Sequence, residues 1–202
     1  MKRPPLRILA GNWRGRKLAA PSAARPTSAR AREALFSILL SEGALAGKTV
    51  LDACAGSGAL GFEALSRGAV SVAFLERDSG ALRENIESLQ CAGQVVLVGR
   101  DALRPPPAPA AVDLAFFDPP WKSDPLPALV ACADAGWLNS ETRIVAVVRA
   151  APNQDSRPWR PFTLVSQRAS GDTRLLFLRL ADAATKTDGF DRDAAEVLHK
   201  NP

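Results

Sequence analysis

From residue 48 onward the chain alternates short apolar segments with segments of helical spacing, and this alternation limits the possible folds strongly. The expected strands are Thr49–Ala53, Ser71–Leu75, Val95–Val98, Val112–Phe117 and Arg143–Val148. The expected helices between them are Ala59–Arg67, Ser79–Leu89 and Leu126–Ala135. Apolar strands connected in this way are typical of a parallel sheet that is covered on both faces.

The pattern changes after residue 150. Phe162–Arg168 and Leu175–Leu180 are two further expected strands, and only the short turn at 170–173 joins them, so we expect an antiparallel pair. Together these elements predict an α/β fold with an open, doubly wound, mostly parallel sheet of seven strands. One more helix is expected to begin at Thr27 or Ser28, because either side chain can cap it.

The N-terminal part of the chain is strongly basic. Residues 1–32 contain nine Lys and Arg and no acidic residue, whereas the other 170 residues contain 17 basic and 21 acidic residues. Such a basic segment on a mildly acidic body indicates a polyanion as partner. Residues 6–10 and 16–19 are expected to form two short strands around a glycine turn. We therefore predict a basic β-hairpin arm at 1–26, the main domain at 27–180 and a disordered tail at 181–202.

Several classes of protein are disfavoured by the composition. Three widely spaced cysteines and one histidine, His199, do not fit a disulfide framework, a metal site or a histidine-based triad. No apolar run reaches the roughly 18 residues that would span a bilayer, and the first residues do not resemble a signal peptide. We expect a cytoplasmic monomer with no metal.

A glycine-rich loop, Gly56-Ser57-Gly58-Ala59-Leu60-Gly61, lies between an expected strand and an expected helix. Asp52 precedes it, where a carboxylate would repel the phosphates of a dinucleotide. S-adenosylmethionine has no phosphate and offers an ammonium, a sulfonium and a ribose instead. Glu76 and Asp101 follow the next two strands and can accept from the ribose hydroxyls and the adenine amine. Glu76 would serve NAD equally well, but three acids at successive strand ends indicate a ligand site, and the position of Asp52 favours S-adenosylmethionine as the cofactor.

Asp118-Pro119-Pro120-Trp121 follows the fourth expected strand and is the most specific signal in the chain. An exocyclic amine on a base is a poor nucleophile because its lone pair is delocalised into the ring. The Asp118 carboxylate and the Pro119 carbonyl can hold the amine hydrogens and direct the lone pair toward a methyl donor. Pro120 rigidifies the loop, and Trp121 offers a face on which an extruded base can stack.

Residues 7–180 resemble the RsmD-type family, which are bacterial 16S rRNA guanine-N2 methyltransferases. The matching segments are 7–18 (RILAGNWRGRKL), 25–28 (RPTS), 32–36 (REALF), 51–61 (LDACAGSGALG), 74–78 (FLERD), 118–120 (DPP) and 171–173 (GDT). The sequence departs from the family in having Trp121 instead of Phe or Tyr, Ala29 instead of Asp, and Ser170 instead of an aromatic residue.

The resemblance implies a Rossmann-like methyltransferase fold, S-adenosylmethionine as cofactor, and 16S rRNA or the assembling small ribosomal subunit as partner. Thr27 would close over the methionine end of the cofactor. The expected cofactor contacts are Thr27, Asp52, Ala55, Gly56, Ser57, Gly58, Glu76, Arg77, Asp101 and Ala102. The expected RNA contacts are Arg7, Arg14, Arg16, Lys17, Arg25, Arg30, Arg32 and Lys122. The expected catalytic residues are Asp118, Pro119, Pro120 and Trp121.

Two other functions fit parts of the sequence. DNA adenine-N6 and cytosine-N4 methyltransferases use a similar loop, but about 200 residues leave no room for a domain that reads duplex sequence. A non-catalytic RNA-binding assembly factor is disfavoured by the intact residues 118–120. A cysteine nucleophile is not expected, because Cys54 has the position of a small core residue. Trp13 fits stacking on RNA and packing equally well, whereas Trp137 and Trp159 are expected to pack.

Overall fold

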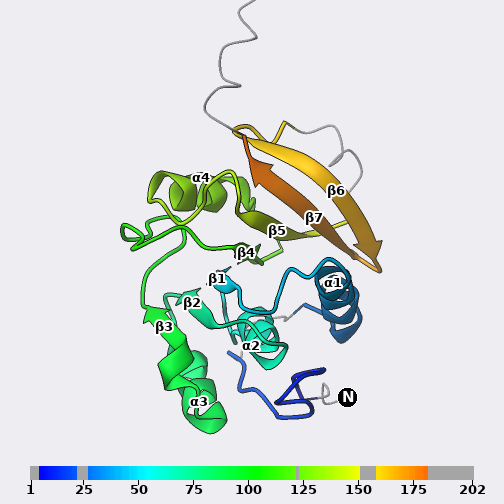
Figure 1. Cartoon of the computed structure of the whole chain (residues 1–202), viewed down its shortest axis with the longest axis vertical. Coiled ribbons are helices and arrows are strands. Elements are labelled where there is room, and N and C mark those ends of the chain that lie inside the picture. The colour runs from blue at the N-terminus through cyan, green and yellow to red at the C-terminus, as the bar shows by residue number, and fades with distance from the viewer. Residues whose placement is uncertain (1–4, 22–26, 122, 151–157, 182–202) are drawn as a thin grey trace, which may run out of the picture.

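The computed structural model describes residues 5–21, 27–121, 123–150 and 158–181. Figure 1 shows a single sheet with helices on both sides. The predicted tail, apart from Ala181, lies outside the described residues, and so do Arg25, Lys122 and His199. None of the helices in the described ranges has the length and apolarity needed to span a bilayer.

The sheet has the predicted architecture. Its strands are β1 (Thr49–Ala53), β2 (Ser71–Leu75), β3 (Val95–Val98), β4 (Leu114–Phe117), β5 (Arg143–Arg149), β6 (Phe162–Ser170) and β7 (Thr173–Leu180). The spatial order is β3-β2-β1-β4-β5-β7-β6. The first five strands are parallel, and β7 runs antiparallel to both β5 and β6. The chain order reverses between β1 and β4, which is where open α/β sheets bind their ligands.

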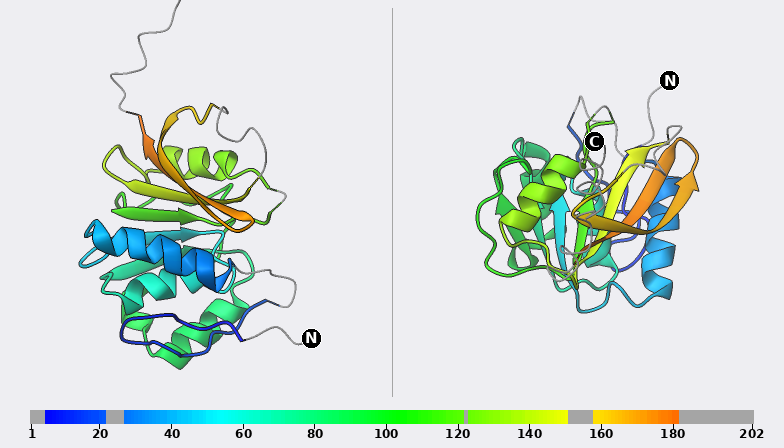
Figure 2. Two further views of the ribbon diagram at one scale, coloured as in Figure 1. Left: turned by 90° about the vertical axis from the view of Figure 1, so that its right-hand side faces the viewer. Right: turned by 90° about the horizontal axis from the view of Figure 1, so that it is seen from above.

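The helices cover the two faces of the sheet unequally. They are α1 (Ala29–Ser41), α2 (Ala59–Ser66), α3 (Gly80–Leu89) and α4 (Leu126–Asp134), with a 3₁₀ turn at Ala92–Gln94. Their ends agree with the predicted ones to within a residue or two. Ser28 caps α1, because its hydroxyl accepts from the Ala31 amide at 3.1 Å. Figure 2 shows α1 and α4 on opposite sides of the sheet.

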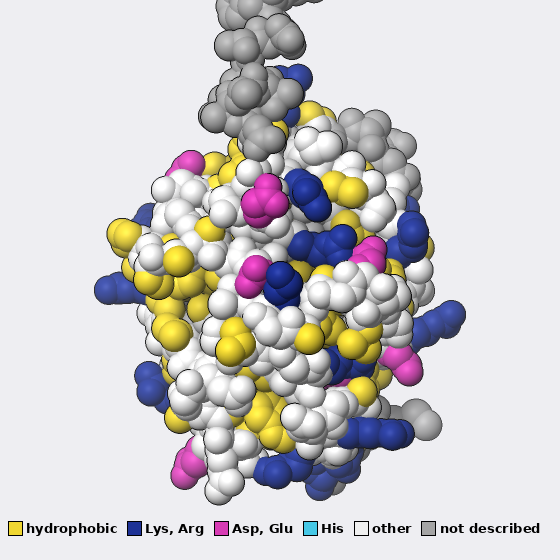
Figure 3. All heavy atoms as spheres, viewed as in Figure 1, with side chains coloured by type: hydrophobic (Ala, Val, Ile, Leu, Met, Phe, Trp, Pro, Cys, Tyr) yellow, Lys and Arg dark blue, Asp and Glu magenta, His cyan; other side chains and the backbone are white. Residues whose placement is uncertain are grey.

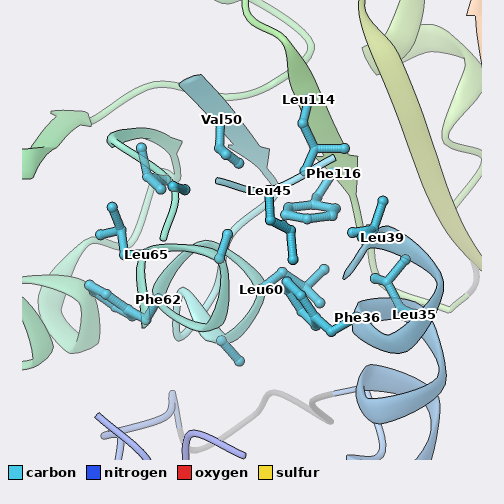
Figure 4. Packing of buried hydrophobic residues seen from close by; sticks show 14 of the residues in the cluster. Leu35, Phe36, Leu39, Leu45, Val50, Leu60, Phe62, Leu65, Leu114 and Phe116 are labelled. Atoms are coloured by element: carbon cyan, nitrogen blue, oxygen red, sulfur yellow. The ribbon is translucent and has the colours of Figure 1, made fainter. Parts of the chain in front are cut away.

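Each face of the sheet has its own apolar core. The first core cluster contains residues of α1, α2 and α3, and the second contains residues of α4. In Figure 4, Phe36 of α1 and Leu60 of α2 lie near Phe116 of β4, and the rings of Phe36 and Phe116 are 5.8 Å apart. A Cβ atom at Gly61 would lie 2.4 Å from the Phe74 ring. Glycine at this position therefore allows α2 to pack closely on β2.

The N-terminal segment, residues 5–21, differs from the predicted pair of strands. The two halves pair only briefly: one isolated bridge forms between Arg7 and Lys17, Ile8 N donates to the Arg16 carbonyl at 3.0 Å, and Leu18 N donates to the Leu6 carbonyl at 2.9 Å. Several backbone amides of this segment are bound to α2 instead: Leu9 N and Ala10 N donate to the Glu63 carboxylate at 2.7 and 3.0 Å. Ile8 is only 1% exposed and belongs to the first core cluster. The segment therefore forms a shorter hairpin than predicted, and its contacts with a helix anchor it to the body.

Candidate functional site

The glycine loop and the carboxylate that follows β2 are joined directly. Gly56 N donates to Glu76 Oε2 at 2.8 Å. Gly58 has a φ of 75°, and a Cβ atom on it would lie 2.6 Å from Leu82 and from Phe62. Only glycine fits there, because the backbone is left-handed and packs against two side chains. At Gly56 a Cβ atom would meet nothing within 4 Å, so the loop is open on that side.

Asp52 lies under the glycine loop and does not line its open side. It is 1% exposed, and its Oδ2 accepts from Gly61 N at 2.9 Å. This amide belongs to the first turn of α2, where backbone donors have no partner within the helix. Burial, together with the negative charges of Asp118 and Glu76, raises the pKa of Asp52 well above its usual range. The expectation of a direct cofactor contact is corrected here, because Asp52 supports the loop from beneath.

The two other acids at the strand ends remain accessible. Glu76 is half-buried, and its second oxygen accepts from Asp78 N at 3.0 Å. Asp101 is half-buried and forms an ion pair with exposed Arg77 at 3.5 Å. Both carboxylates keep acceptor capacity beyond these contacts. They fit a ligand rich in donors, such as the hydroxyls of a ribose and the amine of an adenine.

The remaining predicted cofactor residues differ in exposure. Ala55 is half-buried like Gly56, whereas Ser57 and Ala102 are only 6% and 3% exposed. The Ser57 carbonyl accepts from Asn85 Nδ2 at 2.9 Å, which fixes the loop against α3. Ala102 packs in the second core cluster. The open side of the loop is therefore formed by Ala55, Gly56 and Glu76.

Asp118 follows β4 and is held by the residue that precedes the cap of α1. The Thr27 hydroxyl donates to Asp118 Oδ2. Burial raises the pKa of Asp118 to about 6, against the lowering effects of the Thr27 hydrogen bond and the positive charge of Arg32. Pro119 is buried and Pro120 is exposed. The carboxylate is thus half-buried, anchored on one oxygen, and next to a rigid backbone.

Trp121 has a partner that the sequence did not reveal. The Arg149 guanidinium lies over its ring, 5.7 Å from the centroid. Such an arrangement stabilises the orientation of the ring by a cation–π interaction. Arg149 is the last residue of β5 and lies 28 positions after Trp121 in the chain. No local pattern connects the two residues, and only the pairing of β4 with β5 brings them together.

Arg32 was expected to bind RNA, and this prediction is wrong for the structure. The residue is 2% exposed, and its Nη2 donates to the Arg7 carbonyl at 3.1 Å. Its Nη1 lies 3.9 Å from Glu63, which is fully buried and also forms an ion pair with Arg67 at 2.7 Å. The sequence did contain a signal for this role of Arg32: Glu63 is a charged residue within the apolar helix Ala59–Ser66. A carboxylate that is buried there requires cationic partners.

The other predicted RNA contacts are on the surface where they are described. Arg7, Arg14, Arg16, Lys17 and Arg30 are all exposed. The Arg7 guanidinium donates to the Gly15 carbonyl at 2.7 Å, and that of Arg16 donates to the Ser88 carbonyl. In Figure 3 basic side chains gather at the lower end of the molecule, over the N-terminal segment.

The tryptophans and the cysteine agree with packing roles. Trp137 and Trp159 are each 4% exposed, and Trp137 Nε1 donates to the Pro106 carbonyl at 2.9 Å. Trp13 is half-buried and packs against the first core cluster, which favours the packing interpretation. Burial raises the pKa of Cys54 to about 12, so its thiol is a poor nucleophile. Within the described ranges, no three residues of the types His, Cys, Asp and Glu form a group that would hold a metal.

Comparison with known proteins identifies the relatives of this chain. The family described as Conserved hypothetical protein 95 matches residues 6–179. Ribosomal RNA small subunit methyltransferase D of Haemophilus influenzae is 41% identical over 125 residues, which are 57% of this chain and 64% of that protein. The chain thus spans less than two thirds of that relative's length.

A second relative and a solved structure agree with this result. The protein of the same description from Escherichia coli strain K12 is 37% identical over 147 residues, 69% of this chain and 72% of that protein. The solved structure of the putative methyltransferase yhhF from Escherichia coli has a TM-score of 0.72 and 31% identity, and covers 88% of this chain and 98% of that chain. The chain therefore belongs to the Conserved hypothetical protein 95 family, the RsmD-type methyltransferases.

Proposed function

We propose that this protein transfers a methyl group from S-adenosylmethionine to the exocyclic N2 amine of a guanine in 16S rRNA. The observation that carries the proposal is the Asp118 carboxylate, which is anchored by Thr27 and followed by Pro119 and Trp121. The names of the two curated relatives support a small-subunit rRNA substrate. The guanine amine is our own assignment, based on the resemblance of residues 118–120 and of the N-terminal segment.

In this proposal one group of residues binds the cofactor and another binds the base. Glu76 and Asp101 accept hydrogen bonds from the ribose and the adenine, and the backbone at Ala55 and Gly56 provides the open surface beside them. S-adenosylmethionine, when bound, supplies an electrophilic methyl group on a sulfonium. Glu76 and Asp101 are anionic, and S-adenosylmethionine carries no phosphate for them to repel. The site therefore fits S-adenosylmethionine better than a dinucleotide.

Asp118 and Pro119 act on the nucleophile. The carboxylate and the carbonyl accept the two hydrogens of the guanine amine, and this directs the nitrogen lone pair toward the methyl group. As the nitrogen–carbon bond forms and the carbon–sulfur bond breaks, positive charge develops on the nitrogen, and the carboxylate stabilises it. The amine proton then leaves, and an Asp118 oxygen is positioned to accept it. Trp121 stacks on the extruded base.

The proposal is tested by radiolabelled methyl transfer to three acceptors in parallel. These are small ribosomal subunits from cells that lack the endogenous activity, free 16S rRNA, and DNA. We expect incorporation into the small subunit or its rRNA, and nuclease digestion should release N2-methylguanosine. Methyladenosine, methylcytosine or labelled DNA would contradict the proposed acceptor. Cofactor binding without transfer to any acceptor would instead favour a non-catalytic RNA-binding factor.

A further inference from the structure

The edge of the sheet at which β1, β4 and β5 end has an uneven distribution of charge. On the β1–β3 side lie the carboxylates of Asp52, Glu76 and Asp101. On the β5–β6 side the strand ends carry Arg149 and Arg168. Asp118 follows β4, between the two sides. A cationic cofactor fits the acidic side, and a polyanion fits the basic one.

The strand register places the two arginines on one face of the sheet. Arg149 pairs with Thr173 of β7, and Thr173 pairs with Ser170 of β6. Arg168 lies two residues before Ser170 and therefore points to the same face. Two strand spacings of about 4.8 Å separate β5 from β6, so the two side chains flank a strip of roughly 10 Å.

Helix α1 covers this same face, and its N-terminus lies at the same edge. Thr27, just before α1, contacts Asp118, whereas Glu42 at the other end of α1 contacts Arg143 at the start of β5. The first turn of α1 carries Arg30, which is exposed. Three arginines from three separate elements thus lie toward this edge of the sheet, and one of them, Arg149, contacts Trp121 directly.

Arg149 and Arg168 are available for a ligand. Both are exposed, and no carboxylate within the described ranges forms an ion pair with either of them. The polar contact of Arg168 is with the Gln167 carbonyl at 2.8 Å, which leaves further donors of its guanidinium unused. The Cζ atom of Arg149 lies 5.7 Å from the centroid of the Trp121 ring, and this contact with the ring does not use the N–H donors of the guanidinium.

We propose that Arg149 and Arg168 form a second phosphate-binding surface, which holds the RNA backbone next to the nucleotide that enters the Asp118 loop. The basic N-terminal segment is the first expected RNA surface, and this second surface would bind the RNA beside the reacting base. The inference rests on the proposed function, because its partner is RNA. It assigns to the β5–β6 end the binding of phosphates next to the reacting nucleotide. Arg149 would connect the stacked base, through Trp121, to the adjacent phosphate.

The experiment compares RNA affinity at several salt concentrations for the wild type and two double variants. In the first, Arg149→Ala and Arg168→Ala remove both charges, and in the second, Arg149→Lys and Arg168→Lys keep them. The matched control is Arg179→Ala, because Arg179 is exposed and lies on the same face of β7, six residues after Thr173. The probe is free 16S rRNA, and S-adenosylmethionine affinity is measured in parallel.

We expect the double alanine variant to lose about tenfold or more in RNA affinity at moderate salt. The slope of log affinity against log salt should become shallower by roughly 1.4 to 1.8, which corresponds to two lost phosphate contacts. The double lysine variant should keep most of the slope. The Arg179 variant and the cofactor affinity should stay at wild-type values.

Three results would overturn the inference: an unchanged slope, an equal loss in the Arg179 control, or loss of methyl transfer with RNA affinity intact. The last would restrict Arg149 to packing on Trp121. The assay measures binding, so its result is independent of the chemistry. Wild-type protein that binds rRNA through this surface but methylates another acceptor would contradict the proposed function and leave the surface intact.

Discussion

The Thr27 hydroxyl donates a hydrogen bond to the carboxylate of Asp118, across 91 positions of sequence. This contact connects the loop after β4 to the N-terminus of α1, the helix that also carries Arg32. Arg32 in turn contacts the N-terminal segment through the Arg7 carbonyl and Glu63. The carboxylate that we propose to act on the base therefore lies within the electrostatic influence of a buried cation that also contacts the basic segment.

Replacement of Asp118 should separate catalysis from cofactor binding. We expect Asp118→Ala to reduce methyl transfer by about 10²-fold or more, because the carboxylate acts on the amine in the transition state. S-adenosylmethionine affinity, measured by calorimetry, should remain near wild type. Glu76→Ala serves as the opposite control, with affinity for the cofactor reduced. A parallel loss of affinity and rate in Asp118→Ala would assign Asp118 to the cofactor.

The protonation of Asp118 should determine the acid side of the pH profile. Its pKa is raised to about 6, so the carboxylate is protonated below that pH and cannot accept an amine hydrogen through that oxygen. Methyl transfer should therefore rise as the pH increases through about 6 and level off above it. Charged and titratable groups near Asp118 include Arg32 of α1, Asp52 of β1, and Cys54 just after β1. The measurement is kcat/KM as a function of pH. Asp118→Asn should remove the rise through about pH 6, which we call the acid limb of the profile.

Thr27 should determine the pH at which this acid limb lies. Its hydrogen bond lowers the pKa of Asp118, so Thr27→Val should move the limb to higher pH, and Thr27→Ser should leave it in place. A ¹³C NMR titration of the Asp118 carboxyl checks the same shift without any assay of activity. If Thr27→Val leaves the limb in place and weakens cofactor binding, Thr27 contacts the cofactor, as the family resemblance implies.

Much of the fold was predictable because its signals are local. The strands β1, β2 and β3 have the predicted ends, since each is a short apolar run between polar turns. The N-terminal strands were predicted from a similar alternation, but Leu9 and Ala10 donate to Glu63 rather than to a partner strand. That contact joins residues more than 50 positions apart, so no local pattern predicts it.

The candidate site was predictable in its composition and less so in its roles. Glu76 and Asp101 were placed at the right edge because parallel strands end there together. Asp52 belongs to the same series, yet its carboxylate is used by Gly61 N. The sequence does not distinguish these cases, because the difference depends on which side of the loop the side chain enters. The contact between Arg149 and Trp121 depends on β4–β5 pairing and was not predicted.

Trp121 should contribute through its flat face. We expect Trp121→Ala to weaken turnover more than Trp121→Phe, since stacking on an extruded base is worth about 1–3 kcal/mol. The measurement is kcat/KM with small subunits as substrate, and Trp137→Phe, in the core, is the control for general destabilisation. Equal losses in the two Trp121 variants would restrict this residue to packing against Arg149.

Glu63 should be essential for the attachment of the N-terminal segment. The carboxylate is fully buried and accepts from Leu9 N and Ala10 N while it balances Arg32 and Arg67. Glu63→Ala leaves two buried cations without their partner, so we expect a loss of about 3–5 kcal/mol in the free energy of unfolding. Chemical denaturation measures it, and limited proteolysis reports release of residues 5–21. Glu87→Ala, at an exposed site on α3, should change stability by less than about 0.5 kcal/mol.

The exposed charges of the N-terminal segment should bind phosphates without reading sequence. Arg14, Arg16 and Lys17 lie within four residues of one another on the turn that the Arg7–Lys17 bridge closes, so their positions are defined. If about four charges of the segment contact RNA, log affinity should fall with log salt at a slope of roughly −3 to −4.

Replacement of Arg14, Arg16 and Lys17 by alanine should therefore weaken RNA binding and flatten this slope, with S-adenosylmethionine affinity unchanged. Arg16 also donates to the Ser88 carbonyl, so a thermal denaturation curve must confirm that the variant remains folded. The matched control replaces Arg83, an exposed arginine of α3 outside the segment. A slope equal to that of the wild type would mean that these side chains face solvent in the complex. Arg25, Arg30 and Lys122 would then be the next positions to test, because Arg32 is buried and cannot reach a phosphate.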